Sequence, residues 1–297
     1  MLVGAAVLLG CLVLVAAVLP PRLARARWPL REPVLALLLW QSAGLAGGLL
    51  CLTLAVTLAL APVGTTWSEG WARLPQGLPA SSWLPALLGV VLLSRLASVL
   101  VSSTVRTLRA RRHNRQLVDL VAERNPLLRG TSVVDSTRPV AYCLPGGQPR
   151  LVLSRGTLSL LTYEELTAVL AHERAHLDQR HDLVVLPFVA LGATFPRLAA
   201  VRTARAQVAL LVELLADDRA ARHHDREHLA RALHKIGAGS APGGSLTVAG
   251  GDVLLRARRL LEPPDPVPRW SRVAILVLTA AVAVSPTLGP LVPVLVR

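Results

Sequence analysis

Residues 162–182 read TYEELTAVLAHERAHLDQRHD, and this stretch decides how the polar part of the chain is interpreted. It begins with the pattern of a capping box, in which the side chains of Thr162 and Glu165 each bond the backbone amide of the other residue. Such a box marks the first turn of a helix. The pattern therefore predicts a helix from Tyr163 to about His181.

The middle of this helix is His172-Glu173-Arg174-Ala175-His176, which is an HExxH motif. Residues four apart lie on the same helical face, so both imidazoles can reach one Zn²⁺. The glutamate between them can then act as a general base toward water. The alternative is an ordinary helix that carries two surface histidines.

A second helix is expected over residues 201–224, and it contains Glu213-Leu-Leu-Ala-Asp217. A catalytic zinc needs three protein ligands and one open position, and Glu213 is a candidate for the third ligand. Asp217 follows one turn later, where it can accept the other ring N–H of a ligand histidine. Glu213 also fits an ordinary solvated helix face, but its apolar neighbours would make an unpartnered carboxylate costly.

Three short β-rich segments precede the first helix, at residues 131–135, 139–144 and 150–154. Residues 145–147, Pro-Gly-Gly, supply a turn between the last two segments. Together with the two helices, these segments predict an α+β domain over residues 103–270.

The rest of the chain is strongly apolar. Of its 297 residues, 53% are hydrophobic and only 17% are charged, and the mean hydropathy is +0.51. These values exclude a disordered chain and are unusual for a soluble globule. Long apolar runs predict three transmembrane helices in residues 1–102 (about 2–19, 34–61 and 83–102) and a fourth, bent by prolines, in residues 271–297. A cleaved signal peptide is the alternative for the first run, although no positive segment precedes it.

The arginines beside these runs predict the orientation, because short cytoplasmic loops are rich in basic residues. The loop at residues 20–33 carries four arginines, and residues 104–112 carry another four. The loop at residues 62–82 carries one arginine. We therefore expect a multi-pass plasma-membrane protein with both termini outside and the polar domain in the cytoplasm.

The net charge of +14 raises the question of nucleic-acid binding. Many of the arginines stand beside apolar runs, where membrane topology and contact with lipid explain them better, so we expect no direct nucleic-acid partner. Two of the three cysteines lie within apolar runs, and the sequence has no CxxC motif. Disulfides and a cysteine-type zinc site are therefore not expected.

Three further segments are interpreted from their composition. The apolar run 183–196 is short for a span, so a helical hairpin dipping into the membrane and a buried core segment are both open. Residues 237–251, which are rich in Gly and Ser, predict a flexible linker. Residues 256–259, Arg-Ala-Arg-Arg, predict a short basic helix that can touch anionic lipid.

The two helical motifs, in a polar segment between a third and a fourth span, resemble those of the BlaR/MecR-type integral-membrane zinc metallopeptidases, which are gluzincins with an HExxH motif. HtpX-like and CAAX-processing membrane peptidases are more distant relatives. The resemblance extends over nearly the whole chain and is most specific at residues 172–182 and 213–217. The segment from Tyr142 to Gly156 also fits.

This resemblance implies a mainly α membrane protein, with four transmembrane helices and a cytoplasmic α+β gluzincin metalloprotease domain inserted between the third and the fourth. It implies one Zn²⁺ per chain, bound by His172, His176 and Glu213, with Glu173 as the catalytic base. The implied activity is that of a zinc-dependent endopeptidase that cleaves a cytoplasmic protein, such as a BlaI/MecI-type transcriptional repressor. The oligomeric state is not indicated.

A peptidase also needs a donor that stabilises the oxyanion. The candidates are His181, Arg222, His223, His224 and His228, and the sequence does not choose among them. Each of these residues also fits a position on a basic protein surface.

Two other functions stay open at this point. One is an HtpX-like protease for the quality control of membrane proteins, and the other is a non-catalytic membrane signalling scaffold. A structural zinc site usually has four protein ligands and needs no base, so Glu173 argues against the scaffold. Antibiotic-sensing relatives carry a penicillin-binding domain after the fourth span, whereas this sequence ends at Arg297, so direct sensing of β-lactams is not expected.

Overall fold

The structure is a computed structural model, and it describes residues 1–124, 131–144, 150–240 and 248–295. The chain divides into two compact units. The first unit comprises residues 1–102, 187–208 and 267–297, and the second comprises residues 103–186 and 209–266. Three of the boundaries fall within helices, namely α5 (Ala80–Val121), α8 (His181–Thr194) and α9 (Ala199–Ala220).

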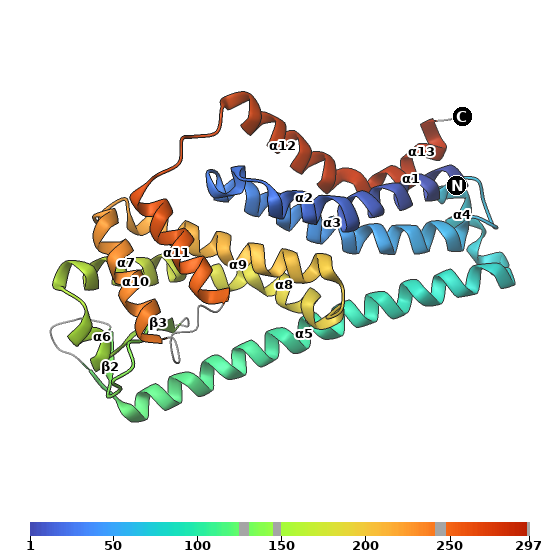
Figure 1. The fold of residues 1–297 in the computed structure, drawn as a ribbon. Coiled ribbons are helices and arrows are strands. Elements are labelled where there is room, and N and C mark those ends of the chain that lie inside the picture. The colour runs from blue at the N-terminus through green and yellow to red at the C-terminus, as the bar shows by residue number, and fades with distance from the viewer. Residues whose placement is uncertain (125–130, 145–149, 241–247, 296–297) are drawn as a thin grey trace. The chain divides into compact units, whose positions relative to one another are not determined.

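The first unit is built from apolar helices (Figure 1). Helix α3 packs against both α1 and α12, and α13 packs on α1. The contact between α1 and α13 is close, because a Cβ atom on Gly4 would lie 2.6 Å from the carbonyl oxygen of Gly289. Besides parts of α5, α8 and α9, the elements are α1 (Leu2–Val13), a π-helical turn (Leu14–Val18), α2 (Leu19–Arg25), α3 (Pro33–Leu60), α4 (Trp67–Arg73), α12 (Arg269–Val284) and α13 (Leu288–Leu295), with 3₁₀ turns at Trp28–Leu30, Leu74–Gln76 and Ser285–Thr287.

Four helical stretches of the described chain are long and apolar enough to cross a membrane. They span Leu2–Arg25, Pro33–Leu60, Ala80–Leu120 and Arg269–Val292. The predictions of a mainly helical protein and of apolar helices that fit a membrane protein are therefore confirmed. The sides on which the termini and the polar domain lie, and the domain boundaries at residues 102 and 270, stay predictions.

The first apolar helix extends further than the sequence predicts. The prolines Pro20 and Pro21 predict an end at Leu19, but the helix continues to Arg25. The π-helical turn separates α1 from α2, so the prolines stand in the first turn of a new helical segment. Amides in a first turn have no intrahelical acceptor, so proline costs little there. The third apolar helix also continues beyond residue 102, to Val121.

The second unit contains a mixed sheet, to which the described residues contribute four strands in the order β1-β2-β4-β3. These are β1 (Ala122–Arg124), β2 (Thr131–Val134), β3 (Ala141–Leu144) and β4 (Arg150–Ser154). The central pair, β2 and β4, is parallel, whereas both outer pairs are antiparallel. The three predicted strand segments are present, while β1 is too short and too polar for its sequence to predict it. The predicted turn at residues 145–147 lies outside the described residues.

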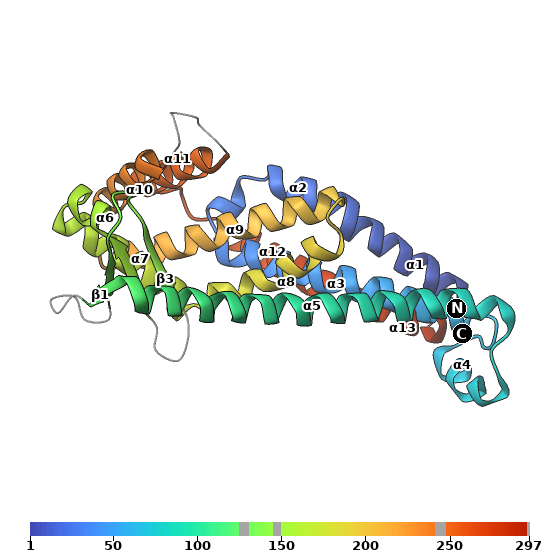
Figure 2. The ribbon, with the colours of Figure 1, turned by 90° about the horizontal axis from the view of Figure 1, so that it is seen from below.

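Successive side chains of β4 point to opposite faces of the sheet, and both faces are buried. Leu151 and Leu153 pack against Leu170 of α7 (Tyr163–Asp178), while Val152 packs with Val118 of α5 on the other face. Strand β3 is at the edge of the sheet, and it contacts α7 (Figure 2). The remaining helices of this unit are α6 (Arg155–Leu160), α10 (Arg226–Ser240) and α11 (Val248–Leu261), and α10 packs on both α7 and α11.

Several predicted helix limits are wrong. Helix α7 ends at Asp178 rather than near residue 181, because Arg180 adopts a left-handed backbone conformation with φ of 48°. Helix α9 covers residues 199–220 rather than 201–224. The run 183–196 is not broken at Pro187, which lies inside α8. Both ends of the predicted linker 237–251 are helical, and residues 241–247 lie outside the described residues.

Candidate metal centre

The first turn of α7 is fixed by the predicted capping box. The Thr162 hydroxyl accepts a hydrogen bond of 3.3 Å from the Glu165 amide, and the Glu165 carboxylate accepts one of 3.0 Å from the Thr162 amide. Glu165 is buried, and its carboxylate also accepts a hydrogen bond of 2.7 Å from Lys235 of α10. These bonds fix where the helix begins, and so which of its faces the later residues occupy.

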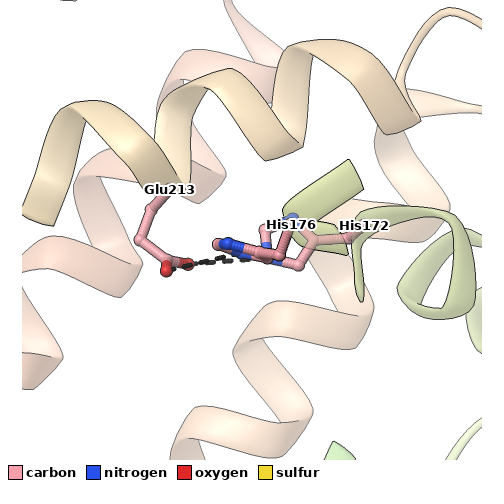
Figure 3. A group of neighbouring side chains, drawn as sticks. All are labelled: His172, His176 and Glu213. Atoms are coloured by element: carbon pink, nitrogen blue, oxygen red, sulfur yellow. Dashed lines mark hydrogen bonds and ion pairs between the residues drawn. The ribbon is translucent and has the colours of Figure 1, made fainter. Parts of the chain in front are cut away.

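Three turns further along α7, the two histidines of the HExxH motif converge with a carboxylate from α9 (Figure 3). Nε2 of His172 lies 3.1 Å from Nε2 of His176. The Glu213 carboxylate lies 3.5 Å from each of these nitrogens, through Oε2 to His172 and through Oε1 to His176. The structure therefore brings together the three side chains that the sequence suggests as metal ligands.

These spacings fit a zinc ion. In a tetrahedral site with ligands at about 2.0–2.1 Å from the metal, neighbouring ligand atoms are about 3.3–3.4 Å apart. The two imidazole nitrogens are 3.1 Å apart, and each of them lies 3.5 Å from one of the two Glu213 oxygens, which is close to that value. Two imidazoles and one carboxylate are also a donor set that catalytic zinc prefers, and they leave a fourth position open.

His172 is held by a buried carboxylate on α9. Its Nδ1 lies 2.9 Å from Oδ1 of Asp217, which is fully buried. The angle between the two groups is poor for a hydrogen bond, so Nδ1 has no well-aligned partner among the described residues. The predicted placement of Asp217 behind a ligand histidine matches this geometry.

Asp217 is in turn held by Arg256 of α11. The Arg256 guanidinium donates two hydrogen bonds of 2.8 Å to the two oxygens of Asp217, in the bidentate geometry that arginine favours. A third guanidinium nitrogen lies 2.8 Å from Oε2 of Glu213. Arg256 therefore connects the candidate ligand Glu213 with the carboxylate behind His172.

His176 has an outer partner of its own. Its Nδ1 lies 3.0 Å from Nδ1 of His181, and Nε2 of His181 lies 2.9 Å from the side-chain oxygen of Gln179. If Nε2 of His176 binds a metal, Nδ1 carries its proton and donates to His181, whose own N–H then bonds Gln179. The left-handed Arg180 ends α7 and lets the chain turn so that His181 returns to His176.

Glu173 faces a cavity of about 460 Å³ that the candidate ligands His172, His176 and Glu213 also line. Cys143, on the edge strand β3, lines the cavity beside it. Burial raises the pKa of Glu173 to about 7, although the nearby His172 and Cys143 oppose the shift.

Burial and the neighbouring charges shift the pKa values of the cluster residues in opposite directions. For His172, burial opposes protonation, but the Asp217 and Glu213 carboxylates outweigh it and raise its pKa to about 9. Burial and the neighbouring His172 lower the pKa of His176 to about 4. Burial also opposes ionisation of Glu213 and Asp217, yet His172 and Arg256 hold the pKa of each at about 2. Both carboxylates are therefore ionised at neutral pH, and His172 would release a proton on binding a metal.

Of the residues predicted as oxyanion donors, one lines this cavity and four do not. His181 lines it, but both of its ring nitrogens are engaged, one with His176 and one with Gln179. The other four candidates, Arg222, His223, His224 and His228, do not line the cavity. Tyr142 of β3 does line it, and burial raises the pKa of its phenol, which therefore stays a neutral donor.

Residues 107–236 match Peptidase family M48. This family includes HtpX and BlaR-type membrane metalloproteases, and its metallopeptidases are zinc-dependent. No curated protein and no solved structure matches the chain.

The match to family M48 supports a metallopeptidase and does not distinguish the BlaR/MecR type within the family. The segment that matches this family contains the HExxH helix, Glu213 and Asp217. Arg256 lies beyond its last matched residue.

Sequence reasoning does not find Arg256 and Cys143, although both lie at this site. The basic helix at residues 256–259 is expected at a lipid surface, but Arg256 is buried against Asp217, and Arg259 pairs with Asp218 at 2.6 Å. The expectation of lipid contact is therefore wrong for these two arginines. A spacing of three residues between two arginines on an amphipathic helix is the signal that could have placed them on one inward face.

Proposed function

We propose that the chain is an integral-membrane zinc-dependent endopeptidase with a cytoplasmic active site. The observation that carries the proposal is the convergence of His172, His176 and Glu213 at distances that fit zinc, with Glu173 in the same cavity. The match to family M48 supports the metallopeptidase activity. The distribution of arginines beside the apolar runs supports the cytoplasmic location.

One Zn²⁺ per chain would be held by His172, His176 and Glu213. When bound, the ion would polarise the scissile carbonyl and acidify a water molecule. Glu173 would take the proton of the attacking water and then pass it to the leaving amine. Arg256 would keep Asp217 and Glu213 in place, so that the ligand set is arranged before a substrate arrives.

The substrate would bind as an extended strand along β3. Tyr142 and Cys143 of this edge strand line the same cavity as Glu173. An edge strand can pair with a peptide backbone irrespective of its side chains, which suits an endopeptidase. The phenol of Tyr142 is then a donor available to the developing oxyanion.

We further propose that the substrate is a cytoplasmic protein, and that a BlaI/MecI-type transcriptional repressor is the first candidate. This step rests on the resemblance of the two helical motifs to those of BlaR/MecR-type peptidases. A second candidate is HtpX-like quality control of membrane proteins, which the family M48 match favours equally because that family includes HtpX.

The experiment compares the purified full-length protein with Glu173→Gln and Glu164→Gln. Glu164 is exposed and lies in the first turn of the same helix, so its variant is the matched control. The substrates are a purified BlaI/MecI-type winged-helix repressor and an unfolded membrane protein. We expect wild type and Glu164→Gln to cleave one of the two, and Glu173→Gln to bind zinc without cleaving. Full activity of Glu173→Gln would contradict the proposal, and the preferred substrate would choose between the two roles.

A further inference from the structure

The first unit contains a cavity of about 600 Å³ that no part of the proposed peptidase uses. Its walls come from the π-helical turn, α2, α3 and α12. This volume is within the range of about 300–1,000 Å³ that is typical of sites for small molecules. The side chains that line it are almost all aliphatic, so the cavity fits an apolar ligand.

One wall of the cavity is formed by a π-helical turn. Residues Leu14–Val18 form a π-helical turn directly before Pro20 and Pro21, and π-turns of this kind are frequent at functional sites. Leu14, Val15 and Val18 of this turn line the cavity. Helix α12 packs on α3, and toward its N-terminus it diverges from α2, as Figure 1 shows.

The dimensions and the polarity of the cavity are those of one lipid chain. The lining residues run from Ile275 in α12 to Ser285, the first residue of the 3₁₀ turn that follows it, and ten residues span about 15 Å along a helix. That length is about half of the hydrocarbon thickness of a bilayer, or one leaflet. At the end near Ile275, the lining changes to Arg22 and Trp28, which are residue types found at headgroup depth.

This end of the cavity is also electropositive. Arg22, Arg25, Arg27 and Arg31 lie within ten residues, and the one acidic residue among them or next to them, Glu32, pairs with Arg272 at 3.3 Å. Arg22 is exposed, and no ion pair between described residues includes it. A cation at this position attracts an anionic headgroup, with about 1 kcal/mol for each basic residue near a membrane surface.

We propose that this cavity is a binding site for one anionic phospholipid. An acyl chain lies along α12 between the π-helical turn and Ile275–Ser285, and the phosphate of the headgroup pairs with Arg22. The proposal rests on the first unit alone and is independent of the peptidase site. It differs from general lipid contact because it requires both a negative headgroup and an acyl chain seated in this cavity.

The experiment titrates the delipidated full-length protein in mild detergent with dioleoyl phosphatidylglycerol, and counts bound lipids by native mass spectrometry. Dioleoyl phosphatidylcholine is the headgroup control, and excess inorganic phosphate tests whether a free anion competes. We expect one tightly bound phosphatidylglycerol per chain, weaker binding of phosphatidylcholine, and no displacement by phosphate.

Three variants locate the site. Arg22→Gln removes the headgroup contact and should weaken phosphatidylglycerol binding about fivefold. Ala281→Trp fills the cavity and should weaken it on the order of tenfold or more, because it displaces buried methylenes. Arg25→Gln removes the same charge from the same helix at a residue that does not line the cavity, and should weaken the affinity clearly less than Arg22→Gln does.

Three results would overturn the proposal. Equal affinity for the two lipids would show that the site does not recognise the charge of the headgroup. Equal losses in Arg22→Gln and Arg25→Gln would show diffuse attraction to the basic loop. A dimer without bound lipid would show that a second copy of the chain covers this face. Because Arg22 is exposed, its variant keeps the test valid even where Ala281→Trp does not fold.

Discussion

Nδ1 of His181 lies 3.0 Å from Nδ1 of His176, although the two residues belong to successive helices. This contact leaves Nε2 of His176 free to face His172 and Glu213. Outer partners of this kind orient ligand histidines and raise metal affinity about 10–100-fold. We therefore expect His181→Ala to weaken zinc binding by about that factor in a competition with a chelating dye.

The control for this prediction is His228→Ala, which removes a histidine of α10 that does not line the cavity. Its zinc affinity should equal that of wild type. Equal affinities for His181→Ala and wild type would show that His181 does not position His176.

The pair of Arg256 and Asp217 should be essential for stability. Arg256→Gln would leave the buried Asp217 carboxylate without its bidentate partner, and such a loss costs about 3–5 kcal/mol. We expect a lower midpoint of thermal unfolding in detergent. Arg258→Gln is the matched change, because Arg258 is exposed and its ion pair within the described part of the chain is with Glu262, one turn along the same helix. A midpoint for Arg256→Gln as high as that of Arg258→Gln would contradict this account.

Gly156 allows α6 to begin directly after β4. A Cβ atom at this position would lie 2.1 Å from the carbonyl oxygen of Thr137, so the backbone would have to move. We expect Gly156→Ala to lower the free energy of unfolding by about 1–3 kcal/mol. Gly192→Ala should do no harm, since the nearest contact there is an ordinary 3.5 Å and alanine favours the helix. The two variants are compared by denaturant titration, and similar effects would refute the steric explanation.

The thiol of Cys143 should react slowly despite lining the cavity. Burial and the Glu173 carboxylate raise its pKa from 9.0 to about 12, so less of the reactive thiolate is present at any lower pH. At pH 8 we expect alkylation by iodoacetamide to be on the order of 10³-fold slower than in the unfolded chain, and to accelerate about tenfold per pH unit. Peptide mass spectrometry of the labelled protein measures this rate. A rate at pH 8 within tenfold of the unfolded value would contradict the assigned environment.

Much of the site is visible in the sequence because its parts are local. The spacing of His172 and His176 and the capping box at Thr162 depend only on helical geometry, which the pattern of a single helix sets. The meeting of this helix with Glu213 is a tertiary contact, and the sequence suggests it only through the chemical need for a third ligand.

Other features depend on contacts that no local pattern contains. Arg256 reaches the site from a helix some 40 residues after Asp217, and its position beside Arg258 and Arg259 looks like a basic surface. The return of His181 depends on the left-handed backbone of Arg180, which is not a residue type that predicts such a conformation. The continuation of the first helix past Pro20 similarly depends on a π-helical turn that composition does not reveal.

The most direct measurement is the zinc content of the detergent-purified protein, by elemental analysis, beside Glu213→Ala and Glu227→Ala. Glu227 is an exposed glutamate on α10, so its variant controls for the loss of a carboxylate. The account predicts about one zinc per chain in wild type and in Glu227→Ala, and little or none in Glu213→Ala. A wild-type protein without metal, or an undiminished zinc content in Glu213→Ala, would contradict the three-ligand site on which the proposed function rests.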